Sequence, residues 1–254
     1  MRYFVRFGYD GSLYHGWQRQ PEDISVQEVM EDALSVLMRR ETEVVGAGRT
    51  DTGVHARMMY AHFDGEIPCD KDRFIRSLNR LVGKSVCIYD ILEVTDNAHA
   101  RFDAVSRTYR YFISSGKNIF MNGRCWECPY DLDMDLMNRG ASLLLGTRDF
   151  TSFAKLHSDA RTNICDVREA FWQPFDPFGS VNPRGLVFTI TADRFLRNMV
   201  RAVVGTLVDL GRGRISLDGF SSVINARNRC AAGSSVAPEG LFLWDVVYPD
   251  NIFI

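Results

Sequence analysis

One glycine-rich stretch, GAGRTDTGVHA at residues 46–56, combines three glycines with a cation, Arg49, and a single carboxylate, Asp51. It lies between two short apolar runs and so predicts a loop with backbone angles that other residues rarely adopt. In extended backbone the i, i+2 spacing puts Arg49 and Asp51 on the same side, with Thr50 pointing away. A nearby guanidinium favours the ionised carboxylate, so the stretch offers a ready anion. A simple turn with a surface ion pair stays open as the alternative.

Two familiar phosphate-binding interpretations fail on this stretch. Gly48 and Gly53 have the first spacing of a P-loop, but Val54 and His55 stand where that motif needs Lys and Ser/Thr. A dinucleotide fingerprint would need a third glycine in place of Asp51, whose carboxylate would repel a pyrophosphate. A nucleotide-dependent enzyme is therefore disfavoured.

Composition indicates a globular protein. A chain of 254 residues with 46% hydrophobic content can bury a core as one large domain or two small ones. No apolar run approaches the roughly 18 residues of a membrane helix. The chain starts with a strand-like YFVRF at 3–7, where a signal peptide would place basic residues and an apolar core. We expect a cytoplasmic protein without membrane attachment.

Net charge and arginine content point in opposite directions on whether the chain binds nucleic acid. The formal net charge of -2 weighs against a nucleic-acid partner as a whole-protein average. However, 26 of the 30 basic residues are Arg and only four are Lys, and the planar guanidinium suits phosphates and stacked bases. Genomic base composition and solvated helix faces are the alternative explanation.

Metal-binding patterns are sparse. Only Cys125 and Cys128 form a C-x-x-C pair, whereas a structural zinc site needs four ligands. His55 and His62 belong to no metal motif and are predicted to pack or to donate and accept hydrogen bonds. We expect neither a metal nor a cofactor.

The periodicity of apolar residues predicts the order βαββαβ twice. The first half has strands near 3–9, 43–46, 58–63 and 86–94, with helices opened by Ser25 and spanning 71–81. The second has strands near 107–114, 164–172, 186–192 and 241–248, with helices near 133–145, 195–210 and, as an extra, 216–226. This predicts an α+β fold of two ferredoxin-like halves, 1–104 and 105–254, joined into one extended antiparallel sheet with helices on one face and a central cleft.

Through residues 48–55 the chain resembles the tRNA pseudouridine synthases of the TruA type, whose signature reads G-R-T-D-x-G-V-H. Matching segments are YDG at 9–11, GWQRQ at 16–20, SVQ at 25–27, HARF at 99–102, RTYRY at 107–111, DFTSF at 149–153, RT at 161–162, FLRNMVR at 195–201 and EGL at 239–241. Met58, Met59 and Tyr60 depart from the Gly-Gln-Val that relatives often have, and Val82 replaces a frequent proline.

The resemblance implies an isomerase that converts uridine to pseudouridine at positions 38, 39 and 40 of the tRNA anticodon stem-loop, works as a homodimer, and needs no metal or cofactor. It implies catalytic roles for Asp51, for Tyr109 beside the extruded uracil, and for Arg201 as partner of Asp51. The tRNA contacts that it implies are Arg49, His99, Arg101, Phe102, Arg161 and Thr162.

Simpler roles stay open for two of these residues, and a second function stays open for the chain. From its pattern alone Tyr109 is a strand aromatic facing the core, and Arg201 is a solvated arginine beside an apolar helix stripe. A non-catalytic RNA chaperone on the same scaffold is the second functional hypothesis. It requires no carboxylate aimed at a base, so Asp51, Tyr109 and Arg201 together favour the enzyme.

Overall fold

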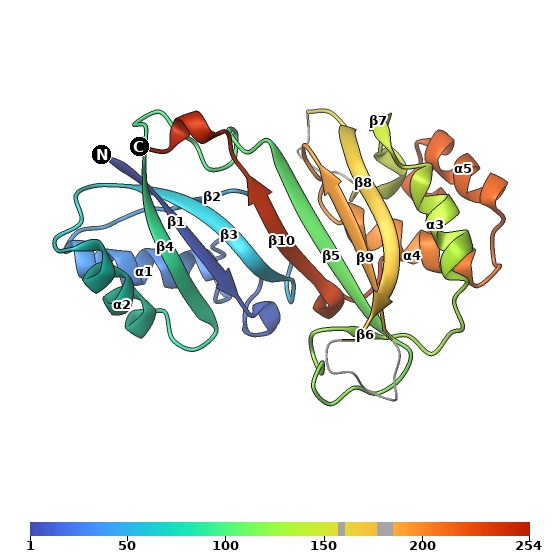
Figure 1. Cartoon of the computed structure of the whole chain (residues 1–254), viewed down its shortest axis with the longest axis horizontal. Coiled ribbons are helices and arrows are strands. Elements are labelled where there is room, and N and C mark those ends of the chain that lie inside the picture. Colours follow the sequence, from blue (N-terminus) through green and yellow to red (C-terminus); the bar gives the residue numbers. More distant parts are fainter. Residues whose placement is uncertain (157–160, 177–184) are drawn as a thin grey trace. The chain divides into compact units, whose positions relative to one another are not determined.

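The computed structural model describes residues 1–156, 161–176 and 185–254 (Figure 1). The chain is a mixed α+β protein whose strands pair mostly antiparallel. Its contacts divide it into two compact units. Unit 1 comprises Met1–Ser106 with Phe242–Ile254, and unit 2 comprises Arg107–Leu241. The C-terminal segment thus contributes to the unit formed by the N-terminal residues.

Unit 1 contains a sheet with the strand order β4-β1-β3-β10, to which the short β2 adds by pairing with β3. Its strands are β1 (Arg2–Tyr9), β2 (Val45–Gly46), β3 (His55–Asp64), β4 (Val86–Val94) and β10 (Leu241–Val247). β1 pairs antiparallel with both β3 and β4, whereas β10 runs parallel to β3. The strands predicted near 3–9 and 86–94 are confirmed, and β3 begins earlier than predicted.

Two helices pack on one face of the unit 1 sheet, α1 (Val26–Met38) and α2 (Lys71–Leu81) (Figure 1). Ser25 caps α1, as predicted, because its hydroxyl accepts a hydrogen bond from the Glu28 amide. α1 buries Val26, Met30, Ala33 and Leu34, which share one helix face. The α2 bounds match the prediction, and Asp70 caps its N-terminus in the same way.

Unit 2 contains a sheet with the order β5-β9-β8-β7, with the short β6 paired to β5. Its strands are β5 (Ser106–Ser114), β6 (Trp126–Glu127), β7 (Gly146–Asp149), β8 (Ile164–Phe175) and β9 (Gly185–Ala192). Its helices are α3 (Met134–Ser142), α4 (Met199–Gly211) and α5 (Leu217–Ala226). The helix α4 is nearly all buried, which its apolar composition explains.

Three details of unit 2 differ from the prediction. The helix expected over 195–210 starts only at Met199, because Asn198 adopts a left-handed conformation with φ 65°. β6 and β7 were not predicted, since two-residue and four-residue strands carry too little periodicity to be detected.

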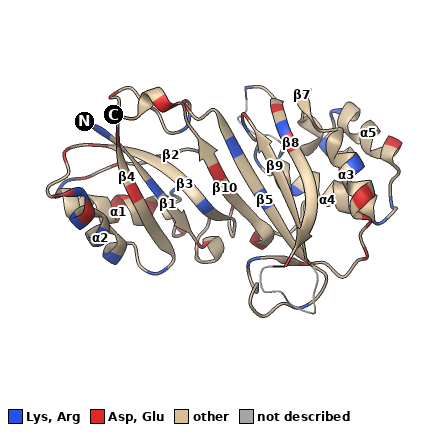
Figure 2. Cartoon of the chain, viewed as in Figure 1, with Lys and Arg blue, Asp and Glu red and all other residues tan. Residues whose placement is uncertain are grey.

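Basic and acidic residues are interspersed along the elements of both units (Figure 2). This matches the small net charge of the chain. Within the described residues, no helix has the length and apolarity needed to cross a membrane.

Candidate active site

The Asp51 loop connects β2 to β3 in unit 1. The two strands pair antiparallel, with Val45 opposite His62, and the Ala47 amide extends the pairing by donating to the Tyr60 carbonyl at 2.8 Å. Beyond Ala47 the chain leaves the sheet and turns back, and the Val54 amide donates to the Asp51 carbonyl at 3.1 Å. Asp51 is half-buried in this turn. A local hairpin connection therefore fixes the backbone that carries the carboxylate.

A second segment, residues 14–17, holds the loop in place. The Trp17 amide donates to the Thr50 carbonyl at 3.2 Å, and the Gly53 amide donates to the Tyr14 carbonyl at 3.4 Å. Gly16 has φ +91°, and a Cβ there would collide with the Thr50 carbonyl oxygen. Glycine is thus required at position 16 for both backbone angle and space.

The side chain of Thr50 anchors the centre of the loop. Its Oγ1 lies 2.9 Å from the Tyr9 hydroxyl, within hydrogen-bonding distance. The contact directs Thr50 towards β1, and the placement of Arg49 and Asp51 on the opposite side stays a prediction. Arg49 is exposed, so its guanidinium is accessible to a ligand.

His55 and His62 are both buried and both accept hydrogen bonds from backbone amides, as predicted for packed histidines. His55 Nδ1 accepts from the Gly11 amide at 3.1 Å, and the ring stacks on Phe242 at 4.5 Å. His62 Nδ1 accepts from the Ala100 amide at 3.1 Å. Burial lowers the pKa of His62 to about 4, which keeps Nδ1 available as an acceptor at neutral pH.

The segment 98–103 presents two side chains to solvent in unit 1. His99 Nδ1 accepts from the amides of Arg101 and Phe102 at 3.1 and 3.4 Å, which forms a tight turn. The Phe102 side chain is 73% exposed, and its ring lies 4.3 Å from the His99 ring. The Arg101 guanidinium lies 5.7 Å from the same ring. An exposed aromatic ring beside a guanidinium is a combination on which nucleic-acid bases can stack.

In unit 2, two tyrosines on one face of β5 have different environments. Tyr109 is half-buried, and its ring meets Phe195 edge-on at 4.9 Å. Tyr111 is fully buried, and its hydroxyl donates to the Ala237 carbonyl at 2.8 Å. Burial raises the pKa of Tyr111 far above its usual range. Tyr111 is therefore a packing residue, as predicted, whereas Tyr109 retains an accessible side.

Arg201 lies in the first turn of α4 and is held by a distant loop. Its Nε donates to the Val236 carbonyl at 2.7 Å, and the Val236 amide donates to the Arg201 carbonyl at 3.2 Å. The side chain is half-buried. This arrangement differs from a freely solvated arginine, since one edge of the guanidinium is committed to the protein.

The loop that holds Arg201 is itself tied down at several points. Arg229 donates to the Gly233 carbonyl at 3.1 Å and to the Ser235 hydroxyl at 3.0 Å. Asn198 Nδ2 also donates to Ser235 Oγ, at 2.6 Å. No sequence pattern predicts this network, apart from an asparagine before a helix, a residue type that tolerates the left-handed conformation.

The remaining predicted residues, Arg161 and Thr162, precede β8 in unit 2. Both are exposed, and Thr162 Oγ1 accepts from the Ile164 amide at 3.2 Å. Asp159 and Ala160, which belong to the same predicted segment, lie outside the described residues. In total, Arg49, Asp51, His99, Arg101 and Phe102 lie in unit 1, and Tyr109, Arg161, Thr162 and Arg201 lie in unit 2.

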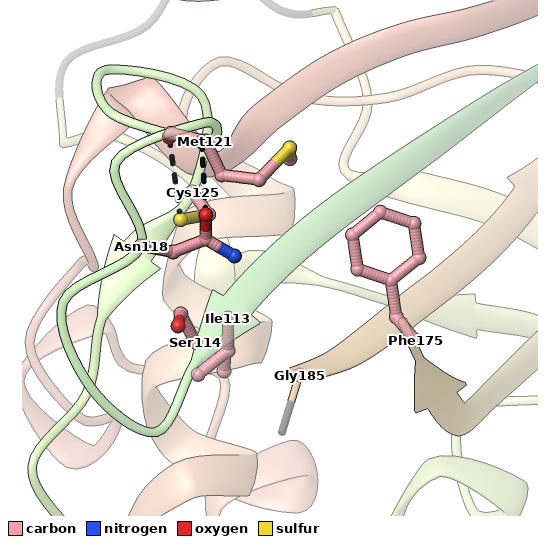
Figure 3. A pocket seen from close by; sticks show the side chains of 7 residues that line it. All are labelled: Ile113, Ser114, Asn118, Met121, Cys125, Phe175 and Gly185. Carbon is pink, nitrogen blue, oxygen red and sulfur yellow. Dashed lines mark hydrogen bonds between the residues drawn. The ribbon is translucent and has the colours of Figure 1, made fainter. Parts of the chain in front are cut away.

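A small hollow in unit 2 contains none of the predicted site residues (Figure 3). It is lined by Ile113, Ser114, Asn118, Met121, Cys125, Phe175 and Gly185. The Cys125 thiol donates to the Met121 carbonyl, with sulfur and oxygen 3.4 Å apart. Burial raises the pKa of Cys125 and Cys128, which disfavours the thiolates that metals bind. Across the described residues no three potential ligands cluster as a metal site.

Comparison with known proteins identifies the family. A profile described as tRNA pseudouridine synthase matches residues 141–249. A tRNA pseudouridine synthase A from Parabacteroides distasonis is 49% identical over 254 residues, covering 99% of this chain and 98% of that protein. The proteins of the same name from Bacteroides fragilis and Porphyromonas gingivalis are 49% and 46% identical, over 99% and 100% of this chain and 98% and 99% of their own. The chain therefore belongs to the tRNA pseudouridine synthase A family.

Proposed function

We propose that this protein isomerises uridine to pseudouridine in tRNA, at positions 38, 39 and 40 of the anticodon stem-loop. The observation that carries the proposal is identity near one half, over almost the entire chain, with relatives named tRNA pseudouridine synthase A. The half-buried Asp51 in its hairpin loop supplies the carboxylate that the reaction needs.

The reaction breaks the bond between ribose C1′ and uracil N1, turns the base, and joins C1′ to C5. The proton on C5 is then lost and N1 gains one, so atoms balance without an external reagent, metal or cofactor. Asp51 acts either by covalent attack or by removing a proton from the sugar. Both routes use the same carboxylate.

Tyr109 and Arg201 are proposed to act on the same nucleotide as Asp51. A tyrosine ring stacks on an extruded base, and its hydroxyl is suited to assist removal of the C5 proton. The accessible side of Tyr109 supports this role, in contrast to the buried Tyr111. The anchoring of Arg201 Nε by Val236 supports a fixed orientation for a cation that stabilises the ionised carboxylate.

The tRNA contacts are assigned to Arg49, His99, Arg101, Phe102, Arg161 and Thr162. Extruding a base costs a few kcal/mol, which arginine contacts to neighbouring phosphates offset. The exposure of Arg49, Arg101 and Phe102 supports these contacts, and His99 shapes the turn that presents two of them.

The architecture proposed for this function is a pair of ferredoxin-like halves with a cleft for the RNA, in a cytoplasmic homodimer. The order β1, α1, β2, β3, α2, β4 in the first hundred residues supports the first half. The elements β5, α3, β8, β9 and α4 supply the same order up to the final strand of the second.

The proposed activity is tested by tritium release from tRNA that carries uridine labelled at C5, without added metal or nucleotide. We expect release by the wild type and by Asp32→Asn, a control that removes an exposed carboxylate of α1 in the same unit. Asp51→Asn is expected to lower kcat at least about 1,000-fold while tRNA binding stays within about threefold. Equal turnover by Asp51→Asn would refute the role of Asp51.

The same experiment decides against the RNA chaperone. A chaperone would bind tRNA and release no tritium in either the wild type or the Asp32→Asn control. Turnover that disappears only with the Asp51 carboxylate is the signature of the isomerase.

A further inference from the structure

Two β-bulges lie close to Gly8 of β1 in unit 1, one in each neighbouring strand. The first is in β3, where the register with β1 shifts between Phe7 and Tyr9. As a result Arg57 and Met58 together oppose Gly8. A bulge places an extra residue in a strand and changes the direction of its side chains, and bulges occur often beside active sites.

The second bulge is in β4, where the register with β1 shifts between Arg6 and Phe7 and leaves Tyr89 as the extra residue. A Cβ on Gly8 would collide with the Tyr89 hydroxyl and would lie 2.9 Å from the Arg57 carbonyl oxygen. The missing side chain of Gly8 thus makes room for the Tyr89 side chain to reach across β1 towards β3. The Tyr89 residue is nevertheless 44% exposed.

Trp244 on β10 completes the group on the other side of Arg57. The Arg57 guanidinium lies 4.8 Å from the centre of the Trp244 ring, and its Nη1 donates to the Trp244 carbonyl at 3.4 Å. Arg57 is exposed and Trp244 is half-buried. Arg57 also opposes the effect of burial on the pKa of Tyr89, which agrees with their proximity.

These three side chains lie on the sheet face that the helices leave open. Side chains alternate along β1, so Gly8 faces away from Phe7, whose ring packs on Trp17 5.8 Å away. Trp17 in turn joins the start of α1 through the hydrogen bond from the Gln27 amide. The carboxylate next to Tyr89, Asp90, is paired with Lys71 at 2.7 Å and does not neutralise Arg57.

We propose that Arg57, Tyr89 and Trp244 form a nucleotide-binding platform for the tRNA strand that flanks the target uridine. This inference rests on the proposed function and extends it to one site on the RNA. A base stacks on the aromatic side chains of Tyr89 and Trp244, and Arg57 binds a phosphate. Aromatic residues on an open sheet face bind bases in this way, and a guanidinium suits phosphate. Arg57 follows Asp51 by six residues, so the two Cα atoms are at most about 20 Å apart, which is a span of a few nucleotides.

The platform is tested by steady-state kinetics of Arg57→Ala and Tyr89→Ala with tRNA at several salt concentrations. We expect KM to rise about tenfold in each variant while kcat stays within about twofold, because neither side chain touches the reacting atoms. For Arg57→Ala, the slope of log affinity against log salt falls by roughly one. The control is Arg76→Ala, which removes an exposed arginine of α2 in the same unit and is expected to leave KM and slope unchanged.

A purely structural role of the Arg57–Trp244 pair gives a different result. It would lower the Tm of Arg57→Ala while the KM and the salt slope of this variant stay at their wild-type values. That result would overturn the platform. Trp244→Phe provides a second readout, since stacking of a base on Trp244 quenches its fluorescence. We expect tRNA to quench the tryptophan fluorescence of the wild type, and to quench that of Trp244→Phe much less. An active wild type with unchanged KM in both alanine variants contradicts the platform alone, whereas an inactive wild type contradicts the proposed function.

Discussion

The Asp51 loop in unit 1 and the Arg201 anchor in unit 2 are built in opposite ways. The carboxylate lies in a hairpin connection whose backbone is fixed by backbone hydrogen bonds, within the turn to Val54 and to the segment 14–17, more than 30 residues earlier in the chain. The guanidinium depends on Val236, 35 residues away, in a loop that Arg229 holds. Backbone hydrogen bonds therefore position the loop that carries the anion, whereas a hydrogen bond from the Arg201 side chain itself positions the cation.

The largest effect is expected from removing the Arg201 guanidinium. Arg201→Ala should lower kcat about 1,000-fold, because the proposed function assigns to Arg201 the charge that stabilises the ionised carboxylate. Arg201→Lys keeps the charge but loses the planar geometry that holds Val236, so we expect a loss of about 100-fold. Single-turnover tritium release measures both. Arg214→Ala, which removes an exposed arginine of unit 2, is the control, and a loss of the same size there would contradict a specific role for Arg201.

The next effect tests the backbone contacts that hold the Asp51 loop. Gly16→Ala places a methyl group against the Thr50 carbonyl at a φ of +91°. We expect a stability loss of about 1 to 3 kcal/mol and a fall in kcat of about 30-fold, because the backbone beside Asp51 must shift. Denaturant unfolding and tritium release measure the two effects.

Gly48→Ala is the matched control in the same loop, since a Cβ at Gly48 meets nothing within 4 Å. Its unfolding free energy should stay within about 0.5 kcal/mol of the wild type. If Gly16→Ala behaves like Gly48→Ala, the clamp from residues 14–17 does not hold the carboxylate.

The smallest effect tests the side-chain contacts that hold Arg201. Arg229→Ala should lower kcat about tenfold with little change in KM, because Arg229 acts on Arg201 only through the Val236 loop. Arg229→Lys should recover part of the activity by restoring a donor to the Gly233 carbonyl. The kcat of both variants is measured together with their Tm. A fall in kcat without a fall in Tm distinguishes positioning from a general loss of stability. Equal kcat in the wild type and Arg229→Ala would show that Arg201 needs no such anchor.

The contrast between the two regions also explains what the sequence could predict. Helices α1 and α2 and the strands β1 and β4 were predicted well because their apolar periodicity and capping residues are local signals. The Asp51 loop was predicted for the same reason, since its glycines and charges are contiguous. His55 and His62 were correctly assigned to packing and hydrogen bonding.

The features that were missed depend on pairing between distant segments. α4 begins later than predicted because the Asn198 side chain donates a hydrogen bond to Ser235, and the apolar periodicity of the sequence carries no sign of that contact. The bulges in β3 and β4 near Gly8 come from strand register, which only the assembled sheet defines. The stacking of Arg57 on Trp244 joins residues that are 187 positions apart, so no local pattern reports it.

The most direct measurement is chemical mapping of pseudouridine in tRNA from cells that lack this protein and are complemented with the wild type or with Asp51→Asn. We predict pseudouridine at positions 38, 39 and 40 with the wild type and unmodified uridine at the same positions with Asp51→Asn, at equal protein levels. Restoration of pseudouridine by Asp51→Asn, or its absence with the wild type, would contradict the central role of the Asp51 carboxylate.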